Sequence, residues 1–218
     1  MANVSRPRGM RPVGNFYGAA WLGKANPYYA NKDGGAANAA PIGIGSIVSL
    51  TGAADESGNG LPVVQKWVGE LDGTGNQTSA ASSPVGVVVG FEIDKTVKGD
   101  LPNHRLISTA RLVYVCDDPN AMFEIQEDAN GGQLAAASVG LHAALTADTP
   151  STTTGYSNQE LDTSTAAASA SLPIKIIAFA RRIDNEVSVS YAKIIVKFVK
   201  HAYATSNSTT TAPAQTGA

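Results

Sequence analysis

The sequence has only one cysteine, Cys116, and no long apolar run. A single cysteine excludes an intramolecular disulfide bond and leaves no cysteine-based zinc site. No stretch approaches the roughly 18 uninterrupted apolar residues that a membrane helix needs. The first twenty residues contain three arginines but lack the apolar core of about seven residues that marks a secretory signal. We therefore expect a soluble protein that has no membrane partner.

Charged residues are also scarce. They make up 16% of the chain, against roughly 25% in ordinary soluble proteins, and the formal net charge is only −2 at pH 7. A protein that coats nucleic acid would carry a basic excess, so we expect no nucleic-acid partner. A surface with so little charge is expected to be covered in part, either by copies of the same chain or by another protein.

The few charges are unevenly placed along the chain. Residues 1–32 hold five basic residues and no acidic one, which leaves the rest of the chain with 11 basic and 18 acidic side chains. The same segment contains five of the 14 aromatic residues, interrupted by glycine and proline. Such punctuation opposes a helix or a packed strand pair and favours an extended arm. Residues 31–40 then predict a flexible joint.

We interpret residues 1–40 as an arm and joint that dock the protein on a protein partner. Arginine, tyrosine and tryptophan are enriched at the energetic centres of protein interfaces, and the acidic remainder of the chain would repel nucleic acid. The alternatives are a disordered segment or an arm whose aromatic residues stack on bases. The expected partner-binding residues are Arg6, Arg8, Arg11, Phe16, Tyr17, Trp21, Lys24, Tyr28 and Tyr29.

Short runs with an alternating apolar pattern follow after residue 41, and this pattern is typical of half-buried strands. Runs that indicate strands cover residues 42–50, 63–71, 84–94, 105–116, 121–126, 172–183 and 187–199. Turns are expected at 117–120 and 184–186, a short helix at 133–145, and a long loop or an edge strand at 146–171. We therefore expect an all-β fold, a β-barrel or β-sandwich of seven or eight mostly antiparallel strands with at most one short helix.

The β domain is expected to span residues 41–201. Residues 202–218 are too polar to bury a core and predict a flexible tail. The sequence shows no alternation of strands with long helices, so a parallel α/β enzyme fold is not expected.

No motif for catalysis or nucleotide binding is recognisable, and we expect no catalytic residue, no cofactor and no metal. The histidines His104, His142 and His201 lack a second ligand at metal-binding spacing, and neither a G-x-S-x-G elbow nor a P-loop accompanies them. A catalytic base among them stays open as an alternative because triads assemble in space. Cys116 ends an apolar run, which favours a small buried residue over a nucleophile.

Five acidic residues crowd a stretch of twelve without a compensating base. They are Asp117, Asp118, Glu124, Glu127 and Asp128. A hard cation such as calcium would need several such oxygen ligands, although the ligand spacing of an EF-hand is absent. The other interpretations are a solvated hairpin end or a patch that meets the basic arm.

Three stretches carry a resemblance: VCDDP at 115–119, FEIQ at 123–126 and RRIDNE at 181–186. With them, residues 84–200 resemble small structural proteins of tailed bacteriophages that are encoded near the major capsid protein and act as capsid cement or decoration proteins. The resemblance implies an all-β, non-enzymatic protein that binds the outside of an expanded capsid, commonly as a trimer. It supplies no functional residues, and it does not cover the arm or the tail.

The expected function is that of a capsid cement protein on the virion exterior, which bridges capsid subunits and stabilises the expanded head. Its expected partners are the major capsid protein and neighbouring copies of itself, in a homotrimer or alternatively a dimer, and it would have no small-molecule substrate. One competing hypothesis is a tail, neck or fibre component or a carbohydrate-binding β-sandwich. Another is a hydrolase that uses His104 or His142 with a nearby carboxylate.

Overall fold

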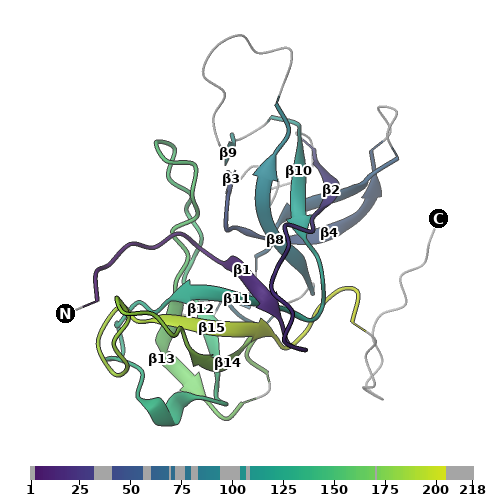
Figure 1. Cartoon of the computed structure of the whole chain (residues 1–218). Coiled ribbons are helices and arrows are strands. Elements are labelled where there is room, and N and C mark those ends of the chain that lie inside the picture. Colours follow the sequence, from purple (N-terminus) through teal and green to yellow (C-terminus); the bar gives the residue numbers. More distant parts are fainter. Residues whose placement is uncertain are drawn as a thin grey trace.

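The computed structural model describes residues 3–31, 41–55, 60–68, 70–71, 77–79, 83–93, 104–106, 109–169 and 171–204. Within these ranges the chain forms fifteen strands and one short 3-10 helix, which confirms the all-β prediction. The strands form a closed barrel and a larger sheet, which lie above and below one another in Figure 1. No helix in this part of the chain is long and apolar enough to cross a membrane.

The barrel contains five strands in the spatial order β10-β2-β5-β4-β8. They are β2 (Asn26–Ala30), β4 (Ile47–Ala54), β5 (Pro62–Lys66), β8 (Pro84–Phe91) and β10 (Arg111–Cys116). Only β2 and β5 run parallel, and they pair through Tyr29 and Val63. Valines dominate the barrel core, since β-branched side chains pack well on a pleated surface. The short strands β3 (Ile42–Gly43) and β9 (His104–Arg105) form a separate pair.

The larger sheet has the order β1-β11-β15-β14-β12-β7-β6, and β13 pairs with β12. Its strands are β1 (Arg11–Asn15), β6 (Glu70–Leu71), β7 (Gln77–Ser79), β11 (Ala121–Gln126), β12 (His142–Leu145), β13 (Leu161–Ala167), β14 (Ile174–Phe179) and β15 (Lys193–Phe198). In β15 every second residue is buried, as the alternating pattern predicts. The 3-10 helix η1 (Ala136–Ser138) precedes β12.

The barrel and the sheet share a hydrophobic core. Ile47, Trp67 and Val87 belong to barrel strands or follow them directly, yet they pack in the cluster that contains Phe123 and Ile125 of β11. The chain also passes back and forth, since β1 lies in the sheet, β2 in the barrel, β6 and β7 in the sheet, and β8 in the barrel. Neither part is therefore a continuous stretch of sequence.

The N-terminal segment is extended as expected, but it is not a separate arm. Strand β1 pairs with β11, from Arg11 opposite Glu124 to Asn15 opposite Ala121, and β2 pairs with β10 and β5. The expected boundary at residue 40 therefore does not separate an arm from the folded body. Glycine and proline do not exclude a strand here, because β1 lies at the edge of the sheet, where a proline such as Pro12 is tolerated.

Several other elements differ in extent from the sequence expectation. Residues 63–71 and 105–116 each divide into two strands, and the helix expected at 133–145 is a 3-10 turn followed by β12. The stretch 146–171 contains strand β13, one of the two alternatives. Strand β15 begins only at residue 193, because Ser188 and Tyr191 have φ values of 59° and 64° that no β-strand can contain.

The predicted joint and most of the predicted tail, residues 32–40 and 205–218, lie outside the described residues. The first residues of the predicted tail contact the barrel. The N–H of Ala202 donates to the carbonyl of Pro84 at 2.9 Å, and the hydroxyl groups of Tyr28 and Tyr203 are 3.1 Å apart.

Candidate functional site

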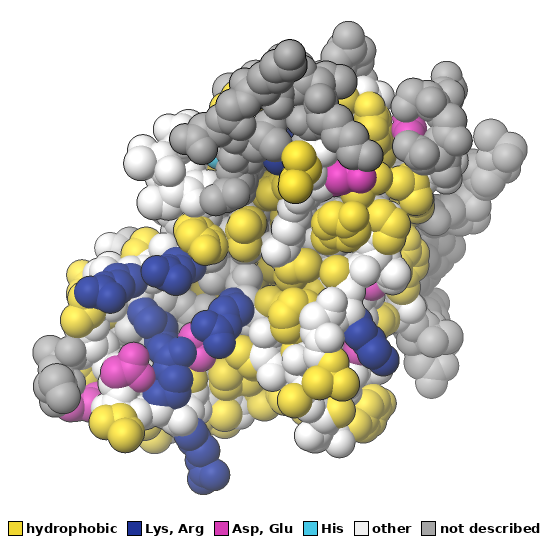
Figure 2. All heavy atoms as spheres, turned by 45° about the horizontal axis from the view of Figure 1, so that its top comes forward, with side chains coloured by type: hydrophobic (Ala, Val, Ile, Leu, Met, Phe, Trp, Pro, Cys, Tyr) yellow, Lys and Arg dark blue, Asp and Glu magenta, His cyan; other side chains and the backbone are white. Residues whose placement is uncertain are grey.

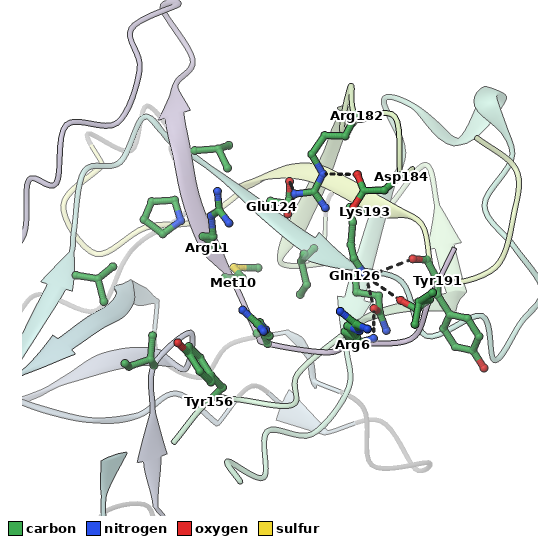
Figure 3. A pocket seen from close by; sticks show the side chains of 18 of the residues that line it. Arg6, Met10, Arg11, Glu124, Gln126, Tyr156, Arg182, Asp184, Tyr191 and Lys193 are labelled. Atoms are coloured by element: carbon green, nitrogen blue, oxygen red, sulfur yellow. Dashed lines mark hydrogen bonds and ion pairs between the residues drawn. The ribbon is translucent and has the colours of Figure 1, made fainter. Parts of the chain in front are cut away.

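A groove of about 960 Å³ opens beside the N-terminal segment (Figure 3). Residues 3–13 form one wall, β11 and parts of the connection between β14 and β15 form the opposite wall, and Val88, Val89 and Tyr156 come from the barrel side. The groove therefore brings together segments that are more than a hundred residues apart in the sequence.

The groove is strongly cationic for a chain with a net charge of −2. Its basic lining residues are Arg6, Arg8, Arg11, Arg182 and Lys193. Only two acids, Glu124 and Asp184, share the lining, so that its formal net charge is +3. Figure 2 shows Lys and Arg side chains gathered on one side of the visible face, with acidic side chains between them.

Two of these cations are held by the protein itself. The Arg182 guanidinium donates to the carboxylate of Glu124 at 3.0 and 3.1 Å and to that of Asp184 at 3.2 Å. Lys193 Nζ donates to Gln126 Oε1, and burial, together with nearby Arg182, lowers the pKa of Lys193. Arg182 and Lys193 thus form the floor of the groove, and some of their N–H groups already donate to side chains of the same chain.

The other three cations point into the open groove. Arg6, Arg8 and Arg11 are exposed, and within the described ranges none of them forms an ion pair. The Arg8 guanidinium lies 5.2 Å from the ring centroid of Tyr156, a distance at which cation–π attraction orients it. Three guanidinium groups are therefore available to carboxylate or phosphate groups of a partner, which they can bind with two parallel hydrogen bonds each.

The N-terminal wall is fixed at both ends. The side-chain amide of Asn3 donates to the carbonyls of Glu186 and Val189 and accepts the N–H of Glu186. Farther along, Met10 is buried and its N–H donates to the carbonyl of Gly45 at 3.0 Å. The backbone of this wall is therefore preformed, so that binding has to order only the arginine side chains.

A loop of residues 16–25 continues the wall after β1. Phe16, Tyr17 and Leu22 are 52%, 80% and 82% exposed, which is unusual for large apolar side chains. Lys197 Nζ lies 5.0 Å from the ring centroid of Phe16. We call the groove and this loop together the N-terminal face.

Most of the predicted partner-binding residues lie on the N-terminal face. Arg6, Arg8, Arg11 and Trp21 line the groove. Phe16, Tyr17 and Lys24 are exposed in the loop. Trp21 is half-buried, packs against the core of the sheet and donates from Nε1 to the carbonyl of Lys24 at 3.2 Å.

Tyr28 and Tyr29 lie elsewhere, on barrel strand β2. Tyr28 is only 3% exposed, and its hydroxyl donates to Asp117 at 2.6 Å. Burial and the Asp117 carboxylate raise the pKa of Tyr28 above its usual range. The prediction that Tyr28 contacts a partner is therefore wrong, because it took β2 for part of a free arm. Tyr29 is half-buried beside Val63 and Leu112.

Sequence reasoning missed the opposite wall and the floor of the groove. Tyr156 stands in a low-complexity stretch, and Tyr191 and Lys193 stand in the run 187–199, which was expected to be a strand. Glu124 and Gln126 belong to the FEIQ stretch, and Arg182 and Asp184 to the RRIDNE stretch, but the resemblance that these stretches carry supplies no functional residues. Pairing of β1 with β11 and of β11 with β15 brings the opposite wall to the N-terminal segment, and a bridge to Ile44 places Tyr156 at the groove. No local pattern reveals such contacts.

Two of the acids at 117–128 accept hydrogen bonds from the N-terminal segment. A contact of this cluster with the arm was one of its interpretations. Asp117 accepts hydrogen bonds from Asn26 and Tyr28, and Asp118 accepts one from Asn15 at 2.7 Å. The contact is made by amide and phenol groups instead of the expected arginines. It fastens the turn between β10 and β11 to both N-terminal strands.

Glu127 and Asp128 of the cluster are hydrogen-bonded to different parts of the chain. Glu127 is fully buried and accepts the N–H of Leu134 at 2.9 Å, while Asp128 accepts the N–H and the hydroxyl of Thr163. In the described part of the chain, no three potential ligands of the types His, Cys, Asp and Glu come together to hold a metal ion.

The histidines lie in separate places. His104 is on β9, His142 is on β12, and His201 follows β15. The buried Nε2 of His104 and Nδ1 of His142 have no hydrogen-bond partner among the residues that the structure describes. These two atoms therefore form no part of a histidine–carboxylate pair of the kind that hydrolases use.

His104 is expected to make stability depend on pH. Burial lowers its pKa, and Arg111 lowers it further. Below pH ~6.5 the unfolded chain therefore binds a proton at His104 more readily than the folded chain does. The stabilisation that comes from this difference is complete above pH ~6.5 and is lost as the pH falls toward the lowered pKa. Relative to a His104→Gln variant, the wild type should lose up to about 1.4 kcal/mol per pH unit in that window. Chemical unfolding of both proteins at several pH values measures this gap, and a constant gap would contradict the expectation.

Cys116 is buried, as the sequence predicts. Burial raises the pKa of its thiol to about 11, so that only about a thousandth of the molecules carry a thiolate at pH 8. We expect a thiol reagent such as DTNB to leave the native protein unmodified and to label one thiol per chain in guanidinium. Rapid labelling of the native protein would contradict this expectation.

No family model matches the chain, and no curated protein and no solved structure is significantly similar to it. The function therefore has to be inferred from the residues themselves.

Proposed function

We propose that the chain is a structural protein of a phage particle, a capsid cement protein that binds the outer surface of an expanded head and bridges neighbouring capsid subunits. The major capsid protein and further copies of the same chain are its proposed partners, and the virion exterior is its proposed location. The role is one of binding, without a catalytic step.

The N-terminal face is the observation that carries this proposal. It presents three arginines without ion-pair partners in the described chain next to exposed Phe16, Tyr17 and Leu22. Arginine and aromatic residues dominate the binding energy of protein interfaces. On a repeating shell such a face needs only modest affinity, because many contacts held on one lattice add by avidity.

The barrel supports the second part of the proposal, self-association. Three large apolar residues are exposed on barrel strands or two residues beyond their ends: Tyr114 on β10, Val68 after β5 and Ile93 after β8. Leu106, which follows β9, is exposed as well. A symmetric homotrimer would cover such residues. Sedimentation velocity at micromolar concentration should show a trimer, and a monomer at that concentration would remove self-association from the proposal.

Binding to heads tests the proposed function. Purified protein is mixed with expanded heads that lack it, the heads are sedimented, and the bound copies are counted by quantitative gel analysis. We expect saturable binding of hundreds of copies per head and a higher temperature of head disruption. A failure to sediment with heads would contradict the proposal, and a saturation at a few copies would point to a tail or neck component instead.

A further inference from the structure

The connection that closes the groove is strained. Tyr191 lines the groove with a φ of 64°, and Ser188 has a φ of 59°. A positive φ is rare for residues other than glycine and is an outlier for a residue as bulky as tyrosine. Such conformations persist where the surrounding structure imposes them, and they concentrate at binding sites. The strained backbone therefore indicates that this end of the groove belongs to a binding site.

The same end of the groove carries exposed apolar side chains. Val4 and Tyr191 both line the groove and are 60% and 36% exposed. Lys193 Nζ lies 3.5 Å from the carbonyl oxygen of each, so the two residues are neighbours. The hydrogen bonds of Asn3 to Glu186 and Val189 hold the two segments together. Val4 and Tyr191 thus form an apolar surface, here called the ledge, beside the arginines of the N-terminal wall.

The arginines are spaced for an extended ligand. Along the N-terminal wall the side chains of Arg6 and Arg8 are exposed while Pro7 between them is half-buried, and Arg11 follows on β1. In an extended chain, side chains two residues apart point to the same face at a spacing of about 7 Å. A ligand with acids at every second position would match Arg6 and Arg8.

We propose that the groove binds an extended acidic segment of a partner protein. Its carboxylates pair with the guanidinium groups of Arg6, Arg8 and Arg11, and an apolar side chain lies on the ledge formed by Val4 and Tyr191. This inference deepens the proposed function and rests on it, because the segment would belong to the capsid subunit on which the chain docks.

The charges of the groove favour a peptide over nucleic acid. A net charge of +3 suits a few carboxylates, whereas a continuous phosphate backbone would also meet Glu124 and Asp184. Arg8 already covers one face of the Tyr156 ring, and this face is not free to stack on a base as in single-strand binding proteins.

A fluorescent peptide tests the inference. The probe is a fluorescein-labelled peptide of about ten residues in which glutamate alternates with alanine, and fluorescence anisotropy at low salt follows its binding to the full-length protein. We expect binding that weakens with salt, and an Arg6→Gln/Arg8→Gln variant should raise the Kd about tenfold. Absence of binding, or equal binding by the wild type and this variant, would overturn the inference.

The matched control is a Lys175→Gln/Lys200→Gln variant. It removes the same charge from exposed positions outside the groove, so its Kd should stay within about twofold of wild type. An equal loss in both variants would show a general charge effect and would overturn the inference. Thermal unfolding of each variant checks that the fold is intact.

Two further probes separate the outcomes. A peptide with glutamine in place of glutamate should not bind, and a thymidine oligonucleotide that binds more tightly than the acidic peptide would overturn the assignment to a peptide. If heads bind the protein but the peptide does not, the inference fails while the proposed function stands. If the peptide binds but heads do not, the groove takes acidic segments and the cement function fails.

Discussion

Replacing Trp67 with alanine should lower the free energy of unfolding by about 3–5 kcal/mol. Trp67 is 1% exposed and follows β5 of the barrel, yet it packs in the cluster that contains Phe123 and Ile125 of the sheet. Truncation removes buried apolar surface and leaves a cavity that these neighbours cannot fill. Guanidinium unfolding followed by circular dichroism measures the loss.

The chain offers its own control for this substitution. Trp21 is half-buried at the groove, so Trp21→Ala should cost only about 1–2 kcal/mol. Because Trp67 joins the barrel to the sheet, the wild type should unfold in one transition. An equal cost at the two positions, or separate transitions of two parts in the wild type, would contradict the shared core.

Replacing Gly45 with alanine should cost about 3 kcal/mol or more. Gly45 has a φ of +89°, and a Cβ atom there would lie 2.3 Å from the carbonyl oxygen of Arg8. The residue cannot turn away, because its N–H donates to Val88 and its carbonyl accepts the N–H of Met10. The added methyl group must therefore push residues 8–10 off the barrel.

Gly52 separates the two causes of this effect. It has a φ of +83°, but nothing lies within 4 Å of the position of an added Cβ. Gly52→Ala should therefore show only the backbone strain, about 1–2 kcal/mol. Chemical unfolding of both variants measures the difference, and equal costs would show that the contact with Arg8 is not tight. In Gly45→Ala, the affinity for heads should also fall under conditions in which the protein stays folded.

The sequence predicts the fold best where its pattern is local. The alternation of Ile194, Val196 and Phe198 predicts β15 because every second residue of a strand enters the core. The start of that strand was placed too early, since the positive φ values at Ser188 and Tyr191 leave no trace in hydropathy.

The N-terminal segment shows why the site was predicted only in part. Its arginines and exposed aromatics could be found from composition, because they crowd one stretch of the chain. Its strands could not, because edge strand β1 depends on pairing with β11, more than a hundred residues later. Another long-range pairing, that of β2 with β10, holds Tyr28 in the barrel, where it is buried, while Tyr17 in the loop after β1 is exposed.

A cryo-EM reconstruction of the assembled particle tests the central claim most directly, namely that the protein docks on a capsid shell through its N-terminal face. We expect density for the barrel and the sheet at repeated positions over the whole icosahedral lattice, with Arg6, Arg8 and Arg11 directed at the shell and a capsid segment in the groove. Density at a single vertex, or copies whose groove faces away from the shell, would contradict the claim.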